Sequence, residues 1–163
     1  MEQFSVAGAI LHQGDDLLLV CNRRRNGSLD WSPPGGVIDE GESVLEGLTR
    51  EVEEETQLRV TEWGARLYSV HVEFVHIEWD LSVEVYDAVG WSGDLHVDDP
   101  DGVVIDARFV EGDAVGPTLE QGPAWVREPL LAWRDSPDPV IEQTMRFRAI
   151  RLEDRSLEVE RLA

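Results

Sequence analysis

The sequence has little of what disulfide-bonded, membrane-spanning and nucleic-acid-binding proteins need. Its single cysteine, Cys21, cannot form an intramolecular disulfide and lies in an apolar run, which predicts a core position. Only 14 residues are basic against 34 acidic ones, for a net charge of −20. This balance argues against a nucleic-acid surface and against docking on anionic lipid. We attribute most of the acidic excess to solubility.

Long apolar runs and targeting segments are also missing. No stretch approaches the roughly 18 apolar residues of a membrane helix, and the first residues lack the basic and apolar regions of a signal peptide. We therefore expect a cytoplasmic protein. With 163 residues and 42% hydrophobic content, a single domain over 1–163 is predicted, because a chain of this length can bury a proper core. A C-terminal β-hairpin extension is a candidate at 146–162.

The apolar pattern predicts a mixed α+β domain, with strands near 5–12, 17–22, 58–61, 66–74, 77–87 and 103–110. Helices are predicted over 44–56 and 123–135, with Pro129 as the weak point of the second. Residues 23–36 are predicted to be irregular, because two prolines followed by two glycines exclude a helix and a central strand. The polar segment 91–102 is predicted to be a loop.

The first predicted helix has a clear start and one apolar face. Ser43 is a good N-cap, and Glu46 three residues later completes a capping box. Leu45, Leu48 and Val52 form an apolar stripe at helical spacing.

Three glutamates share another face of the same helix. Glu51, Glu54 and Glu55 stand at i, i+3 and i+4, whereas Glu53 lies on the other side. Their like charges repel one another, and a hard divalent cation such as Mg²⁺ would remove that repulsion. The spacing alone leaves two interpretations open, a metal site and a solvated acidic helix face.

The residues around these glutamates resemble the Nudix box. That motif is Gly, five residues, Glu, seven residues, Arg-Glu, an aliphatic residue, any residue, Glu-Glu, any residue, Gly and an aliphatic residue. Eight of its nine fixed positions match, namely Gly36, Glu42, Arg50, Glu51, Val52, Glu54, Glu55 and Leu58. The ninth, normally Gly, is Gln57. The preceding segment 31–36 resembles the family's usual lead into the loop, and the resemblance covers residues 5 to about 135.

The resemblance implies a fold and a set of roles. The fold is a Nudix-type αβα sandwich around a mixed β-sheet. Mg²⁺ or Mn²⁺ would be held by Glu51, Glu54 and Glu55, with the backbone carbonyl of Gly35 as a further ligand. Glu42 and Arg50 would form a structural ion pair, and Gly36 belongs to the same structural motif. The general base would be Glu51, with Glu54 as the second choice.

Three further positions carry weaker signals. Asp106 resembles an additional acid that many members of the family use, and an outward polar residue on a strand is the alternative interpretation. Arg25, one of the arginines at 23–25, is a candidate phosphate-binding residue, or simply part of a solvated turn. Trp31 is a candidate for stacking on a base, or a core residue.

The implied activity is hydrolysis of the phosphoanhydride bond of a nucleoside diphosphate linked to another group. The chain lacks the proline after the box that is common in ADP-ribose hydrolases, and it lacks the tyrosine that is common in dinucleoside-polyphosphate hydrolases. These absences favour a nucleoside triphosphate or a modified nucleotide as substrate, in a protein that could form a homodimer.

Two other functions stay open at this point. The first is a non-catalytic Nudix-like module that senses a nucleotide or a sugar nucleotide, although such modules usually lose box glutamates. The second is an isopentenyl-diphosphate isomerase, for which Cys21 in an apolar strand is badly placed.

Overall fold

The structure, a computed structural model, describes residues 1–136 and 144–162. The predicted domain also includes 137–143 and 163, which lie outside the described residues. In chain order the elements are β1 (Glu2–Ile10), β2 (His12–Gln13), β3 (Asp16–Arg23), β4 (Leu29–Ser32), β5 (Gly35–Val37), α1 (Val44–Thr56), β6 (Arg59–Phe74), a 3₁₀ turn (Val75–Ile77), β7 (Trp79–Ser92), β8 (Val104–Val110), α2 (Gly112–Leu119), α3 (Ala124–Asp135), β9 (Met145–Arg151) and β10 (Leu157–Leu162). None of the helices described is both long and apolar enough to cross a membrane.

Two sheets organise the chain. The larger has the strand order β10-β9-β6-β7-β1-β5, and the smaller consists of β2, β3 and β4 with β8 added to β3. The larger sheet is mixed, because β1 with β7 and β6 with β9 are parallel pairs while its other pairs are antiparallel. The predicted mixed sheet is therefore confirmed.

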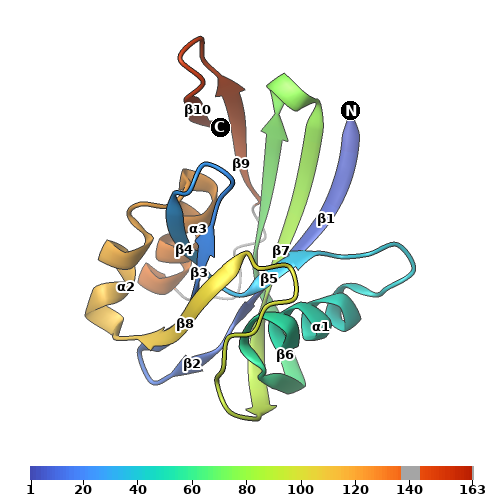
Figure 1. Ribbon diagram of the computed structural model, residues 1–163, viewed down its shortest axis with the longest axis vertical. Coiled ribbons are helices and arrows are strands. Elements are labelled where there is room, and N and C mark those ends of the chain that lie inside the picture. Colours follow the sequence, from blue (N-terminus) through green and yellow to red (C-terminus); the bar gives the residue numbers. More distant parts are fainter. Residues whose placement is uncertain (137–143, 163) are drawn as a thin grey trace.

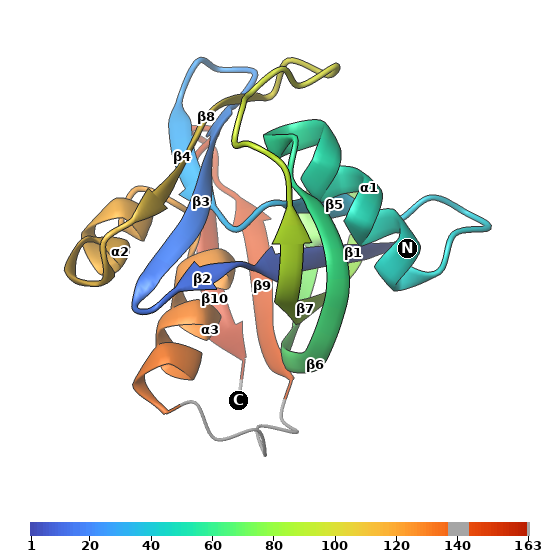
Figure 2. The same ribbon diagram turned by 90° about the horizontal axis from the view of Figure 1, so that it is seen from below.

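Helices cover both faces of the larger sheet (Figures 1 and 2), as the predicted αβα sandwich requires. On one face, Leu48 and Val52 of α1 pack on Ala7 and Ala9 of β1. On the other face, residues of α2 and α3 pack on a core from β6, β7 and β9 that includes Val72 and Phe147. Cys21 lies in β3 and is buried, as predicted.

Helix α1 has the bounds predicted from the sequence. The Ser43 hydroxyl accepts a hydrogen bond from the Glu46 N–H, and the Glu46 carboxylate accepts one from the Ser43 N–H, so the capping box is present. The helix ends at Gln57, which is left-handed with φ 63° and donates its N–H to the Glu53 carbonyl. Gln57 thus adopts the left-handed conformation that glycine adopts most easily.

Several sequence-based elements need correction. Residues 29–32 and 35–37 are short strands, not irregular chain. Both lie at sheet edges, where the intervening Pro33 and Pro34 break no ladder. The strands predicted at 58–61 and 66–74 form one strand, β6, with register shifts between Val60 and Tyr68. Helix α2 was missed, because Gly112, Gly116 and Pro117 disfavour a helix.

The C-terminal residues form an antiparallel hairpin of β9 and β10, and β9 adds to β6 in parallel. The hairpin thus continues the larger sheet at the edge opposite β5. Figure 1 shows it beside the far ends of β6 and β7, away from α1.

Candidate metal and substrate site

Helix α1 and strand β5 together position the three glutamates. Val52 fixes the rotation of the helix, because it is fully buried against the sheet. This leaves Glu51, Glu54 and Glu55 on the side next to β5, where their environments differ. Glu55 is buried with 6% of its surface exposed, whereas the side chain of Glu54 is 33% exposed. The acidic face therefore runs from a buried carboxylate to a half-exposed one.

Glu55 is held by the backbone of Gly35. The Gly35 N–H donates to the Glu55 Oε1 at 3.0 Å. In the antiparallel pair with β1, the neighbouring hydrogen bonds are made by Pro34 and Ile38, so Gly35 stands at a position that does not bond to β1. Because the N–H and C=O of one strand residue point to the same side, its carbonyl also points away from β1.

Gly35 and Gly36 of β5 lie too close to neighbouring atoms for a residue with a Cβ. A Cβ at Gly36 would lie 2.7–2.9 Å from the carboxylate atoms of Glu51, and a Cβ at Gly35 would lie 2.1 Å from the Ala7 carbonyl oxygen. Any larger residue would displace either the carboxylate or the strand. The Gly-Gly pair thus brings the backbone of β5 directly against the acidic face of α1.

Arg50 connects the loop before the helix with two of the glutamates. Its Nε and Nη2 each lie 2.9 Å from a carboxylate oxygen of Glu42, a bidentate contact. Its Nη1 lies 3.1 Å from Glu51 Oε1 and 3.4 Å from both carboxylate oxygens of Glu54. Two hydrogen bonds lower the pKa of Glu42, the larger effect coming from Arg50 and the smaller from the Asp39 N–H.

Burial shifts the pKa values of two of these glutamates upward in the metal-free protein. Burial raises the pKa of Glu55 to about 8; the Gly35 N–H opposes this shift, and the charges of Glu51, Asp99 and Glu54 add to it. Burial also raises the pKa of Glu51, against the opposing charge of Arg50. Both pKa values are raised because these carboxylates are buried away from water and lie near other negative charges. A bound cation would lower both pKa values again.

Sequence reasoning missed two acids close to this face. Asp99 and Asp101 lie in the loop between β7 and β8, and their charges contribute to the raised pKa values of Glu55 and Glu51, respectively. The loop is tied to the end of α1, because the His96 N–H donates to the Thr56 carbonyl. The sequence signal was the three aspartates at 98, 99 and 101, shortly before a strand.

The Asp99 side chain also shapes this loop. Its carboxylate accepts hydrogen bonds from the backbone N–H groups of Asp101, Val103 and Val104. Asp99 therefore fixes the backbone on which Asp101 stands.

The donor set fits a hard divalent cation, although the side chains are not yet arranged around one. Within 1–136 and 144–162, no three His, Cys, Asp or Glu side chains converge closely enough to hold a metal ion. The Arg50 guanidinium lies against the carboxylates of Glu51 and Glu54, and the Glu55 carboxylate turns to Gly35. Binding would need only new rotamers of these glutamates, since their backbone positions share one helix face.

A pocket of about 250 Å³ opens next to the two glycines. It lies between the two sheets, and residues from β1, β3, β4, β5, β6, β7 and α3 line it. Its polar groups include Asn22, Arg24 and Ser32, and its aromatic ones are Tyr68 and Trp125. Asn22 donates to Ser32 Oγ at 2.8 Å, and Arg24 forms a bidentate contact with Asp30. These contacts hold a polar wall in place opposite an apolar floor.

The weaker sequence candidates lie elsewhere. Arg24, not its neighbour Arg25, lines the pocket. Trp31 lies under the guanidinium of Arg108, at 4.9 Å from the ring centroid to Cζ, and lines a separate hollow beside α2. Asp106 pairs with Arg108 at 2.5 Å and stands opposite Cys21 in β3. Among the residues described, no hydrogen bond or ion pair joins Arg25, Trp31 or Asp106 to the glutamates, and their proposed roles stay predictions.

Comparison with known proteins agrees with this geometry. The NUDIX domain family model matches residues 2–133, and the chain belongs to this family. A MutT-like protein of Streptomyces ambofaciens is 42% identical over 60 residues, a match that spans 37% of each chain.

The fold is that of known solved structures. The MutT protein from Methanosarcina mazei Go1 superposes with a TM-score of 0.69 at 22% identity, over 84% of this chain and 96% of that one. The E. coli ORF135 protein gives a TM-score of 0.69 at 20% identity, over 86% and 96% of the two chains. At these identities the likeness establishes the Nudix fold.

Proposed function

We propose that the protein is a Nudix pyrophosphohydrolase that needs a divalent metal. It would cleave the phosphoanhydride bond of a nucleoside diphosphate linked to another group, with a nucleoside triphosphate or a modified nucleotide as the preferred substrate. One observation carries the proposal. Gly35 and Gly36 lie against the carboxylates of Glu55 and Glu51 on one side and line the pocket on the other.

The metal would be Mg²⁺ or Mn²⁺, held by Glu51, Glu54, Glu55 and the carbonyl of Gly35. When bound, such an ion polarises the P–O bond and lowers the pKa of a coordinated water. The raised pKa values of Glu51 and Glu55 support this assignment. Burial disfavours the ionised form of each carboxylate, and a nearby cation would stabilise that form. Glu51 is our proposed general base, with Glu54 as the alternative.

The pocket would take the nucleoside part of the substrate. Trp125 and Tyr68 offer aromatic surface for a base, and Asn22 and Ser32 offer polar groups for its edge. Arg24 stands at the same pocket and carries a cationic group suited to a phosphate, although Asp30 neutralises it in part. A substrate bound in this way would direct its phosphates past Gly35 and Gly36 toward the glutamates.

The second candidate is a non-catalytic sensor of a nucleotide or sugar nucleotide. The retained glutamates at 51, 54 and 55 favour the enzyme, whereas the ion pairs of Arg50 with Glu51 and Glu54 leave room for the sensor, because they occupy two of the proposed metal ligands. A cytoplasmic location, a homodimer and action on small molecules alone, with no nucleic-acid polymer or membrane as partner, belong to the same proposal.

A release assay over a substrate panel separates the two functions. The panel holds canonical and oxidised nucleoside triphosphates, ADP-ribose, NADH, diadenosine polyphosphates and nucleotide sugars, each with Mg²⁺ and with Mn²⁺. We expect metal-dependent turnover of at least one member, with nucleoside triphosphates or their modified forms the fastest. Binding of a nucleotide without any turnover would establish the sensor instead.

A further inference from the structure

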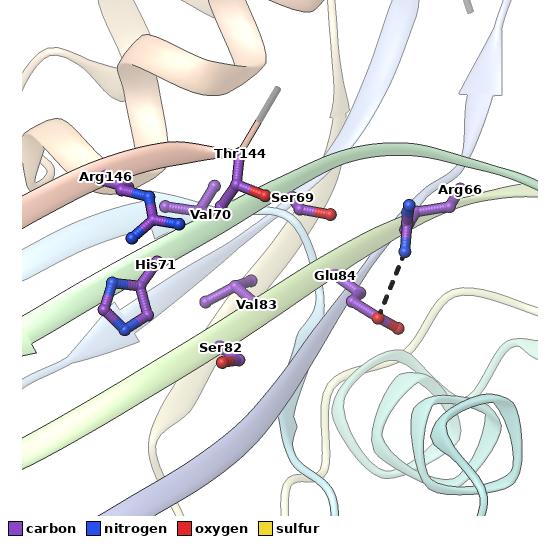
Figure 3. A pocket seen from close by; sticks show the side chains of 9 residues that line it. All are labelled: Arg66, Ser69, Val70, His71, Ser82, Val83, Glu84, Thr144 and Arg146. Carbon is purple, nitrogen blue, oxygen red and sulfur yellow. Dashed lines mark ion pairs between the residues drawn. The ribbon is translucent and has the colours of Figure 1, made fainter. Parts of the chain in front are cut away.

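A second hollow, of about 410 Å³, lies on the larger sheet outside the site described above. It is formed where β6, β7 and the start of β9 run side by side. Figure 3 shows its polar side chains: Arg66, Ser69 and His71 from β6, Ser82 and Glu84 from β7, and Thr144 and Arg146 at β9.

These side chains stand on the same sheet face as α1. Tyr86 and Ala88 of β7 pack in the cluster that α1 covers, and alternation along the strand puts Ser82 and Glu84 on that face too. The face is therefore apolar under the helix and polar beyond it. A polar, hollowed continuation of a sheet face has no role in packing the core.

The hollow brings two arginines and a histidine together on an otherwise acidic molecule. The whole molecule carries a net charge of −20, so an anion is repelled from most of its surface. In the hollow, Arg66 and Arg146 oppose one carboxylate, that of Glu84. His71 and Arg146 are register partners on adjacent strands, so imidazole and guanidinium stand next to each other.

Two carboxylates at the hollow, those of Glu84 and Asp80, already contact other side chains. Glu84 pairs with Arg66 at 3.5 Å and accepts a hydrogen bond from the Tyr86 hydroxyl at 2.7 Å. Asp80 contacts His71 Nε2. Within the described residues, Arg146 forms no ion pair with a carboxylate, whereas Arg148 two residues on pairs with Glu73. Among the described residues, no carboxylate therefore neutralises the guanidinium of Arg146, whereas Glu84 neutralises Arg66 in part.

We propose that this hollow binds a phosphate-type oxyanion, either free phosphate or the phosphate group of a small metabolite. Arg146 and Arg66 supply the charge, and the hydroxyls of Ser69, Ser82 and Thr144 supply neutral donors, a combination that suits a tetrahedral oxyanion. The site does not depend on the proposed hydrolase activity, because it uses none of the glutamates of α1.

The hollow and the substrate pocket share one layer of the sheet. Val70 of β6 and Val83 of β7 are register partners, and both residues border the hollow on one face and the pocket on the other. An oxyanion bound here would therefore sit directly behind the wall of the substrate pocket.

The test is a titration of the full chain with inorganic phosphate in EDTA at constant ionic strength. Calorimetry measures the affinity, and amide chemical shifts locate the bound phosphate. We expect saturable binding, with shifts at β6, β7 and the start of β9. Arg146→Gln should weaken binding at least about tenfold, since it removes a charge-assisted contact. Arg148→Gln removes the same charge from the same strand and should leave binding unchanged.

A variant that should tighten phosphate binding complements the two arginine variants. Glu84→Gln removes the competing carboxylate and should tighten phosphate binding severalfold. Ribose 5-phosphate distinguishes the two sources: tighter binding than that of phosphate assigns the hollow to a phosphorylated metabolite, and equal binding assigns it to free phosphate. The proposal is overturned if phosphate does not bind, if Arg146→Gln binds like wild type, or if the shifts fall on Asn22, Gly35 and Gly36.

Discussion

Glu53, Glu54 and Glu55 follow one another in the chain, yet their side chains meet three different environments. Glu53 is about half exposed and lies 3.9 Å from the guanidinium of Arg59, which is more exposed still. Glu54 shares Arg50 with Glu51, and Glu55 is buried against the Gly35 N–H. The same residue type is therefore solvated, half-buried and buried within a single turn of helix.

These environments predict very different effects of the same mutation. Glu54→Gln and Glu55→Gln should each lower turnover of the best substrate at least about a hundredfold with the fold retained, because each removes charge that holds the proposed metal, an effect typically worth ~3 kcal/mol. Steady-state rates with Mg²⁺ and Mn²⁺, together with circular dichroism, measure this. Glu53→Gln is the matched control and should change the rate little. Near wild-type rates in both site variants would place the metal elsewhere.

Gln57 is the one departure from the family motif, and its backbone explains why Gly is usual there. At φ 63° it pays the cost of a left-handed residue with a Cβ. Gln57→Gly should therefore stabilise the protein by up to ~1 kcal/mol, seen as a higher denaturation midpoint in urea. Turnover should change less than about threefold, because the glutamates lie upstream of the helix end. A tenfold gain in rate would instead mean that Gln57 distorts the site.

At the scale of elements, the loop between β7 and β8 is the part of the candidate site with the least signal in sequence. Helix α1 could be predicted to the residue, because its capping box and apolar stripe are local. The charges of Asp99 and Asp101 act on the glutamates, and the hydrogen bond from the His96 N–H ties their loop to the end of α1. No spacing in the sequence encodes that hydrogen bond, so Asp99 and Asp101 could not be predicted, whereas Asp106 was chosen for its resemblance to a family position.

The loop also gives a prediction of its own. Asp101→Asn should raise the Mg²⁺ concentration for half-maximal rate severalfold and change the maximal rate much less, because it removes one nearby negative charge without removing a glutamate on α1. Metal titrations of the rate measure both quantities. Asp94→Asn, in the same loop, is the control. Equal effects of the two variants would assign the result to net charge.

The strands show the same division between local and long-range information. The fold class followed from the motif and the apolar pattern, whereas β4 and β5 were missed because the prolines and glycines at 33–36 disfavour a strand locally. They are strands because β1 and β3 offer edges to pair with. Pairing at an edge is a property of the assembled sheets, and it overrides the local preference.

For the molecule as a whole, the raised carboxylate pKa values make stability depend on pH. The folded protein holds the Glu55 proton up to about pH 8, whereas an exposed glutamate releases it near 4.5. The contribution of Glu55 is therefore fully present below pH 4.5 and is lost as the pH rises toward 8, by at most about 1.4 kcal/mol per pH unit. The raised pKa of Glu51 acts in the same direction.

Thermal unfolding in EDTA should accordingly show a midpoint that falls between pH 6 and pH 8. Glu55→Gln should flatten this dependence, because a neutral amide has no proton to lose, and Glu53→Gln should keep it. Saturating Mg²⁺ should flatten it as well, since a bound cation favours the ionised carboxylates. A midpoint that rises with pH, or an unchanged slope in Glu55→Gln, would contradict the burial of this group.

Cys21, the single thiol of the chain, lies in β3, the strand that carries β2, β4 and β8. Burial, with the charges of Asp106 and Asp30, raises its pKa, so the thiol is both shielded and protonated. An alkylating reagent can reach it only when the smaller sheet opens. The rate of Cys21 alkylation therefore measures how often the smaller sheet opens in the unmodified protein. A ligand that contacts both sheets should slow this alkylation.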